Sequence, residues 1–367
     1  MPMKTITVGL GERAYDIVIE KGLLADVGKD LKQRAFAKRY VVVADSHVAE
    51  LLGRTLMAGL AASSVQAEII TFPRGEASKH LATVAELASQ LARLGLDRKD
   101  GLIALGGGVT GDITGFLASI YMRGIPFVQI PTTLLAQVDS SVGGKTGVDI
   151  PEGKNLVGAF YQPRRVYIDS SVLLSLPDVE LLNGLAEVIK YSVIRDADFF
   201  RFLAANREAI LARDLALLEQ VILRCCAIKA EVVAMDEREA DLRRILNFGH
   251  TLGHAVEAAS GYALPHGLAV GIGMAAACDL AAARGIFPQQ TAEEVRRLIA
   301  DYGLPVDIPG NFTADGIKSF LKTDKKTVAG RPFFVLPTAI GRVVITDDVD
   351  EELIDRVLEG KAGVKPL

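Results

Sequence analysis

The sequence has no tryptophan and few cysteines, histidines and aromatic residues. Its 367 residues include three Cys and five His, and aromatic residues make up 6%. The adjacent Cys225 and Cys226 and the lone Cys278 show no regular spacing, which excludes a disulfide framework and a metal site built from four cysteines. Free cysteines are typical of a reducing compartment, so we expect a cytoplasmic protein.

A basic excess and a membrane-spanning run are missing as well. The formal net charge is −4, so no nucleic-acid-binding surface is expected. The longest apolar run, residues 268–278, stops at Asp279 and is too short to cross a bilayer. The amino-terminal residues show no charged start followed by an apolar run, so no signal peptide is expected. We therefore expect neither a nucleic-acid partner nor a membrane partner.

The length and the order of sequence patterns predict two domains. Up to residue 175, strand and helix patterns alternate after a hairpin signal at Gly11-Glu12. This alternation predicts a mainly parallel sheet covered on both faces. From residue 176 on, long helical patterns dominate, one of them over residues 246–259, and strand patterns return only over 331–336 and 342–346. The sequence therefore predicts an α/β fold, with an N-terminal α/β domain at 1–175 and a mostly α-helical C-terminal domain at 176–367.

A glycine-rich turn, Gly106-x-Gly108-x-x-Gly111, stands between a predicted strand and a predicted helix. It matches the dinucleotide fingerprint, in which glycines let backbone N–H groups approach a pyrophosphate at the start of a helix. Close packing of a strand and a helix can produce the same turn, and the usual acidic residue about twenty positions later is missing. Asp45, which ends an earlier strand, is the acidic residue available for a ribose. A nucleotide would then span several strand ends, from Asp45 over residues 74–79 to the glycine turn.

The stretch Asp139-Ser-Ser-Val-Gly-Gly-Lys145 invites comparison with a phosphate-binding P-loop. That motif needs glycine where Asp139 stands, and no clear buried strand precedes it, so we reject the P-loop interpretation. Lys145 and Lys154 remain as two cations in a glycine-rich stretch that also holds Asp139 and Asn155, and we predict irregular backbone there. Such stretches often carry function, but a solvated loop with surface lysines fits the pattern equally well.

Two of the five histidines, His250 and His254, stand four residues apart in one predicted helix, and His266 follows. Residues four apart share a helix face, so both imidazoles should point into one space, with Arg243 and Asn247 a turn or two earlier. Neutral imidazole is a common zinc ligand, and this pattern suggests His250 and His254 as a metal-binding pair. A buried pair of hydrogen-bonded histidines is the alternative.

Glu187, Lys190 and Tyr191 share one face of the helix predicted to begin at Pro177. A carboxylate aimed at two histidines would complete a set of three protein ligands and leave one position open for substrate, as in catalytic zinc sites. A surface ion pair between Glu187 and Lys190 is the alternative.

In combination, these stretches resemble the 3-dehydroquinate synthases of the sugar phosphate cyclase group. The wider superfamily includes metal-dependent polyol dehydrogenases. No single stretch would be sufficient, but together they are specific. They follow one another in the family's order between residues 41 and 336: residues 106–112 (GGGVTGD), 131–133 (PTT), 139–145 (DSSVGGK), 187–190 (EVIK) and 246–254 (LNFGHTLGH).

The resemblance implies one divalent metal, zinc or cobalt, held by Glu187, His250 and His266, and it gives His254 to the substrate instead of the metal. It implies NAD as cofactor, bound by Asp45, Arg74, Gly75, Glu76, Ala77, Ser78, Lys79, Gly108, Val109, Thr110, Gly111, Asp112, Thr132, Thr133, Lys145, Lys154, Val172, Leu173, Leu174 and Ser175. Substrate and catalytic contacts are implied for Arg123, Asp139, Lys145, Lys154, Asn155, Lys190, Lys229, Glu239, Arg243, Asn247, His254 and one of Lys325 and Lys326. A homodimer is implied as well.

The implied reaction converts 3-deoxy-D-arabino-heptulosonate 7-phosphate into 3-dehydroquinate and phosphate, a lyase step of the shikimate pathway to aromatic amino acids. NAD accepts a hydride so that the neighbouring C–H becomes acidic, the metal stabilises the alkoxide, phosphate is eliminated, and NADH returns the hydride before ring opening and aldol closure. The many cations fit a substrate with a phosphate and a carboxylate. His254 and Asn247 are candidates to stabilise developing oxyanions.

Three other functions stay open at this point. A metal- and NAD-dependent polyol dehydrogenase would need fewer cations. A related cyclase acting on a sedoheptulose phosphate or a hexose phosphate would not need to bind a carboxylate, for which Lys229, Arg243 and Asn247 argue by resemblance. A non-catalytic nucleotide-binding protein would leave Glu187 and the histidines without a purpose.

Overall fold

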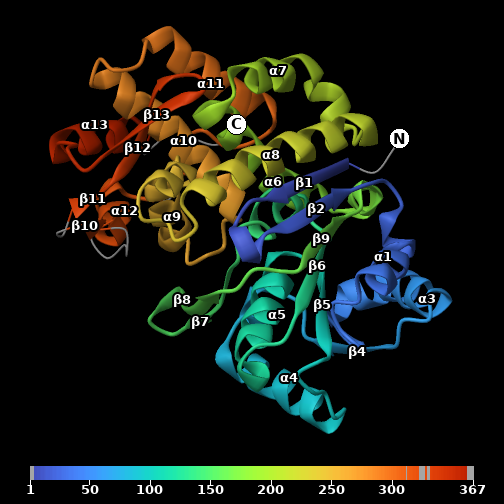
Figure 1. Ribbon diagram of the computed structural model, residues 1–367. Helices are drawn as coiled ribbons and strands as arrows, with labels where there is room; N and C mark the ends of the chain where they lie inside the picture. Colours follow the sequence, from blue (N-terminus) through green and yellow to red (C-terminus); the bar gives the residue numbers. More distant parts are fainter. Residues whose placement is uncertain (1–3, 311, 322–326, 329–330, 362–367) are drawn as a thin grey trace. The chain divides into compact units, whose positions relative to one another are not determined.

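The computed structural model describes residues 4–310, 312–321, 327–328 and 331–361. The chain forms two compact units, one of residues 1–176 and 215–238, the other of residues 177–214 and 239–367. The units differ from the predicted linear division in one place, because helix α8 (Leu215–Met235) belongs to the first unit, where it packs against β1 (Lys4–Val8) (Figure 1).

The first unit is built on a seven-stranded sheet in the order β1-β2-β9-β6-β5-β3-β4. The predicted hairpin is confirmed, because β1 and β2 pair antiparallel, and the other neighbours pair parallel. Strand β9, in the interior of the sheet, was not predicted. The remaining strands are β2 (Tyr15–Ile19), β3 (Tyr40–Asp45), β4 (Ala67–Phe72), β5 (Gly101–Gly106), β6 (Phe127–Pro131) and β9 (Arg165–Ile168).

Helices cover both faces of this sheet, as predicted. Along β3, Val42 and Ala44 pack into the cluster of α1 (Val27–Arg34) and α3 (Arg54–Ala62). The alternate residues Val41 and Val43 pack into the cluster of α4 (Leu81–Arg93) and α5 (Gly108–Ile120). A strand that is apolar on both sides is typical of a parallel sheet buried between two helical layers.

Residues 141–144 do form turns and bends as predicted, but from Lys145 on the stretch predicted as irregular backbone is instead a β-hairpin. Strands β7 (Lys145–Ile150) and β8 (Gly153–Phe160) pair antiparallel, with a register shift between Val148 and Ile150. The glycines misled the prediction: an added Cβ at Gly158 would lie 2.1 Å from the carbonyl oxygen of Thr146, so glycine serves close strand pairing here and does not mark a loop.

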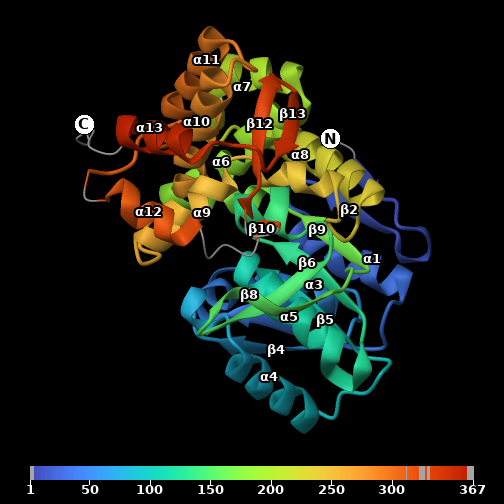
Figure 2. The same ribbon diagram turned by 90° about the vertical axis from the view of Figure 1, so that its left-hand side faces the viewer.

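The second unit is mostly helical, as predicted, around the apolar helix α10 (His266–Ala283). By length and composition α10 could cross a membrane, but 72% of it is buried inside the structure, as expected for a core helix. It packs against α6, α9, α11, α13 and β12 (Figure 2). The two strand patterns predicted over 331–336 and 342–346 correspond to β12 (Phe334–Ala339) and β13 (Arg342–Thr346), which pair antiparallel as a hairpin. The other elements are α6 (Asp178–Arg195), α7 (Ala197–Leu211), α9 (His250–Ala259), α11 (Gln289–Asp301), α12 (Ala314–Leu321), β10 (Thr327–Val328), β11 (Arg331–Pro332) and α13 (Glu351–Lys361).

The helix predicted over residues 246–259 is wrong at its start. A 3-10 helix, η8 (Leu242–Asn247), ends before Gly249, whose φ of 79° is left-handed, and α9 begins only at His250. Left-handed backbone favours glycine and interrupts an α-helix. Arg243 and Asn247 therefore do not share a helix with His250, and the face expected from their spacing does not exist.

Candidate functional site

Three helices of the second unit bring Glu187, His250 and His266 together. Glu187 lies in the middle of α6, while His250 and His266 are the first residues of α9 and α10. The Nε2 atoms of His250 and His266 lie 3.5 and 3.7 Å from Glu187 Oε1. His254 is the third imidazole of the group, with its ring centroid 5.2 Å from that of His250 and 5.5 Å from that of His266.

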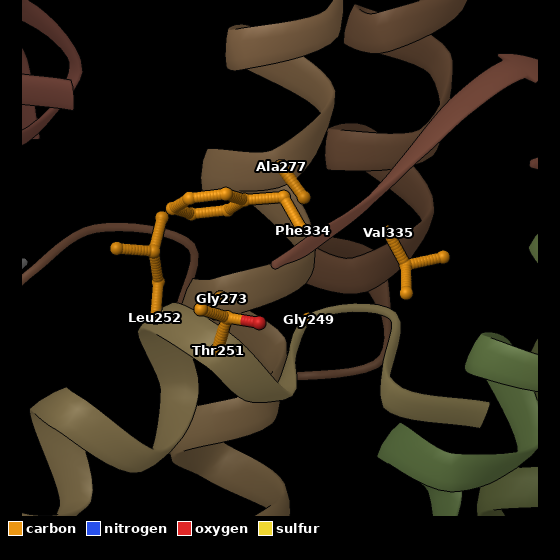
Figure 3. A pocket seen from close by; sticks show the side chains of 7 residues that line it. All are labelled: Gly249, Thr251, Leu252, Gly273, Ala277, Phe334 and Val335. Carbon is orange, nitrogen blue, oxygen red and sulfur yellow. The ribbon is translucent and has the colours of Figure 1, made fainter. Parts of the chain in front are cut away.

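Glycines at the crossing of α9 and α10 make this approach possible. An added Cβ at Gly273 would lie 1.9 Å from the carbonyl oxygen of Gly249, so the two backbones touch there. Figure 3 shows the result: Leu252 and Phe334 close over the crossing, where they line a pocket of about 10 Å³, barely the size of a water molecule. The crossing is thus rigidly packed, and it holds the start of α9 next to α10.

In His250 and His266, the other ring nitrogen, Nδ1, also has a hydrogen-bond partner. His250 Nδ1 lies 3.1 Å from the carbonyl oxygen of Phe248, and His266 Nδ1 lies 3.0 Å from Glu257 Oε2. Metal-binding histidines almost always donate their other N–H to a carbonyl or a carboxylate in this way. Both rings therefore present Nε2 toward Glu187.

Glu187 is fully buried, and its exposed fraction is 0%. It forms an ion pair with Lys190, which is also buried and lies 5.0 Å above the ring of Tyr191. Neither carboxylate oxygen accepts a well-directed hydrogen bond from the residues that the structure describes. The alternative of a surface ion pair is wrong, because both side chains lie in the interior.

These donors fit a divalent metal. A tetrahedral ion with ligands at about 2.0–2.2 Å separates its ligand atoms by roughly 3.4 Å, close to the two distances around Glu187 Oε1. Lys190 already pairs with one oxygen of this carboxylate, while the other, Oε1, accepts no hydrogen bond from the described part of the chain and faces both imidazoles, so a metal would give it a partner. The three imidazoles alone also offer nitrogen atoms within 4.8 Å of one another, so His254 is the competing third ligand.

The other predicted substrate residues of this unit lie in and before η8. Arg243 and Asn247 are buried, and Asn247 Nδ2 donates to Glu239 Oε1 at 2.6 Å. Lys325 and Lys326 lie outside the described residues.

In the first unit, the residues assigned to the nucleotide, apart from Lys145 and Lys154 in the β7–β8 hairpin, follow the carboxyl ends of five neighbouring parallel strands, β4, β3, β5, β6 and β9. Those ends share one edge of the sheet, the usual ligand-binding edge of open α/β folds. The residues comprise Asp45 at the end of β3, 74–79 after β4, 108–112 at the start of α5, 132–133 after β6 and 172–175 after β9. The strand ends that a nucleotide would have to span, as expected from the sequence, therefore belong to strands that are neighbours in the sheet.

Of these residues, Asp45 also stabilises the local backbone, and three others line a cavity. Asp45 Oδ1 accepts from the backbone N–H groups of His47 and Val48, both at 3.0 Å, and caps a helical turn. Val172, Leu174 and Ser175 line a cavity of about 320 Å³, which is within the size range of small-molecule sites.

A charged cluster joins the loop after β4 to the β7–β8 hairpin. The buried Lys79 Nζ lies 2.7 Å from Asp112 Oδ2 and donates to Asn155 Oδ1 at 2.7 Å. Burial lowers the pKa of Lys79, but the charges of Asp112 and Glu76 outweigh it, so the pKa ends above its ordinary value. Lys154 Nζ lies 3.5 Å from Glu76 Oε1. Lys79 therefore stays a cation at neutral pH.

Four further residues assigned to the substrate lie elsewhere in the first unit. Lys229 on α8 donates to the carboxylate and the carbonyl oxygen of Asp139, both at 2.7 Å. Arg123 has a left-handed φ of 67° and is exposed, as is Lys145 at the start of β7.

Sequence reasoning missed Glu257, Asn183 and Asp149. Glu257 stands seven residues after His250 and so shares its helix face, a signal that was available. Asn183 accepts a hydrogen bond from Gly267 N at 2.5 Å, and Asp149 Oδ1 accepts one from Asn155 N at 2.7 Å. The contact of Asn183 links segments 84 residues apart, and that of Asp149 depends on the β7–β8 hairpin, which was not predicted, so no spacing rule indicated either.

Comparisons with known proteins agree on the family. Sequence models of the N-terminal and C-terminal parts of 3-dehydroquinate synthase match residues 69–183 and 184–327. The 3-dehydroquinate synthase of Thermodesulfovibrio yellowstonii is 45% identical over 97% of this chain and 99% of its own.

Among solved structures, a 2-deoxy-scyllo-inosose synthase with carbaglucose-6-phosphate, NAD+ and Co2+ is 27% identical, with a TM-score of 0.90 over 98% of this chain and 100% of its own. The 2-epi-5-epi-valiolone synthase of Streptomyces hygroscopicus, with NAD+ and Zn2+, is 32% identical, with a TM-score of 0.87 over 94% and 96%. The two models of the 3-dehydroquinate synthase family together cover most of the chain, and the Thermodesulfovibrio yellowstonii enzyme is 45% identical over 97% of it. The chain belongs to the 3-dehydroquinate synthase family.

Proposed function

We propose that this protein converts 3-deoxy-D-arabino-heptulosonate 7-phosphate into 3-dehydroquinate and phosphate, as a lyase that depends on NAD and one divalent metal. The observation that carries the metal dependence is Glu187, a fully buried carboxylate that faces the Nε2 atoms of two histidines. When bound, NAD supplies a reversible hydride acceptor, and a zinc or cobalt ion held by Glu187, His250 and His266 supplies a Lewis acid.

The chain's own residues have separate tasks in this proposal. Lys190, whose ammonium group is buried beside Glu187, is positioned to hold an anionic substrate oxygen near the metal ligands. His254 borders the two metal-binding imidazoles and donates to an oxygen on which charge develops. Arg243 is suited to a carboxylate because its planar guanidinium can form two parallel hydrogen bonds.

In the first unit, the helix start at Gly108 favours a pyrophosphate, since the first N–H groups of a helix have no acceptor within it. Thr132 and Thr133 follow the neighbouring strand, and the cavity beside Val172 offers room for part of a nucleotide. Lys79 and Lys154 add positive charge close to that edge. Family membership also leads us to propose a cytoplasmic homodimer.

The related cyclases are weaker candidates, because the chain is more similar to named 3-dehydroquinate synthases than to the two cyclases with other products. The test supplies the heptulosonate phosphate with NAD at a small fraction of the substrate concentration. Phosphate release far beyond the amount of NAD is expected, with 3-dehydroquinate as the cyclic product. NADH that accumulates in step with substrate consumption would indicate a dehydrogenase and contradict the proposal.

A further inference from the structure

Glu257 places a second buried carboxylate next to the histidine group. It lies on α9 one further turn along the face that carries His250 and His254, and its side chain is 8% exposed. Its Oε2 atom lies 3.0 Å from Nδ1 of His266. Burying a carboxylate is unfavourable unless a partner group compensates for the lost hydration. For Glu257 that partner is His266, which raises the question of what the contact does for His266.

The contact determines which nitrogen of His266 carries the hydrogen. An ionised carboxylate can only accept, so Nδ1–H donates to Glu257 and Nε2 keeps its lone pair. That lone pair is on the side of the ring that faces Glu187 Oε1, 3.7 Å away. Glu257 is bonded to the opposite ring nitrogen, so it acts through His266 and not on an ion itself.

His266 needs this support more than His250 does. Its side chain is 30% exposed, whereas that of His250 is 11% exposed and is held by a backbone carbonyl group. The backbone at His266 is already anchored, because Gly267 N donates to Asn183 Oδ1 and a Cβ at Gly267 would lie 2.2 Å from the carbonyl oxygen of Asn183. With the backbone held by α6, the ring orientation is the remaining freedom.

We propose that Glu257 is a positioning residue that orients His266 for the divalent metal. The proposal rests on the metal site of the proposed function. Losing such an outer partner typically weakens metal binding about 10–100-fold. The effect should appear in metal affinity itself, before any substrate is present.

The experiment measures the zinc Kd of the full-length protein by competition with a chromophoric chelator. Glu257→Gln should raise the Kd by about tenfold and Glu257→Ala by up to about 100-fold. The matched control is Glu219→Gln, which alters a buried carboxylate of the first unit that bonds Lys4 and Ser170, and it should leave the Kd unchanged. Cobalt-loaded Glu257→Gln should also show an altered visible spectrum, because ring orientation affects the geometry of the ion.

The outcomes separate this inference from the proposed function. If Glu187→Ala abolishes tight zinc binding while Glu257→Gln keeps the wild-type Kd within roughly twofold, the metal site stands and the role of Glu257 is overturned. If the wild-type protein binds no zinc or cobalt, both proposals fail. Glu257→Gln preserves side-chain volume, so it decides the question even if Glu257→Ala does not fold.

Discussion

Replacing Glu187 by glutamine should change stability in two separable ways. The substitution keeps the volume of a fully buried side chain but removes the negative charge next to the buried ammonium group of Lys190. Removing one charge of a buried pair costs about 3–5 kcal/mol. With a chelator present, the variant should therefore unfold at a clearly lower urea concentration than the wild type.

Zinc should increase the difference in the free energy of unfolding between the wild type and Glu187→Gln. An ion that binds only the folded protein stabilises it by about 2.7 kcal/mol at a free concentration one hundred times its Kd, and the variant should gain almost none of this. Circular dichroism in urea, with chelator and with buffered zinc, measures both differences. Glu219→Gln is the control, since it also removes the charge of a buried carboxylate paired with a lysine, here the partly exposed Lys4, but should keep the whole zinc increment. A Glu187→Gln protein that gained the wild-type zinc increment would refute the assignment of Glu187 to the metal.

Three further predictions concern other parts of the chain. His250→Ala should lose the metal, whereas His254→Ala should retain it while turnover falls about 10²–10³-fold. Mass spectrometry measures the metal content and phosphate release measures turnover. Equal loss of metal in both variants would make His254 a ligand. Gly273→Ala should destabilise by about 1–3 kcal/mol or more and weaken zinc binding, because its methyl group would lie 1.9 Å from a backbone oxygen of α9. Urea unfolding should show no such loss for Gly360→Ala, where the methyl group meets nothing within 4 Å. Burial raises the pKa of Cys226 to about 12, so the folded protein should resist iodoacetamide at this residue up to pH 9. Above the ordinary cysteine pKa of 9.0, the unfolded thiol loses its proton while the folded thiol keeps it, so the free energy of unfolding should fall as pH rises. Rapid labelling of folded protein at pH 8, seen by mass spectrometry, would contradict the burial argument.

The sequence predicted the strands and helices well wherever an apolar period was clear. Strands β3 and β5 read as continuous apolar runs, and both proved to be buried on two faces. The hairpin β7–β8 was missed because its glycines resemble a loop, although they serve close strand pairing. Helix α8 lies among the long helical patterns predicted after residue 176, but spacing alone could not place it against the first unit.

For the candidate site as well, the sequence predicted features of single helices but not the contacts between segments far apart in the chain. The shared face of His250 and His254 followed from helical spacing, but spacing could not distinguish which of the histidines binds a metal. The helix face that carries Glu187 suggested it as their carboxylate partner, but His266 was made a ligand only by family resemblance. The approach of these side chains depends on the crossing at Gly273, which no local pattern reveals. The break at Gly249 requires left-handed backbone, and a glycine inside a helical pattern does not by itself announce one.

The most direct test of the account begins with protein freed of both metal and nucleotide. Supplied with the heptulosonate phosphate, it should release phosphate only when zinc or cobalt and a trace of NAD are both restored, and one NAD should support many turnovers. Full activity with either component left out would contradict the account.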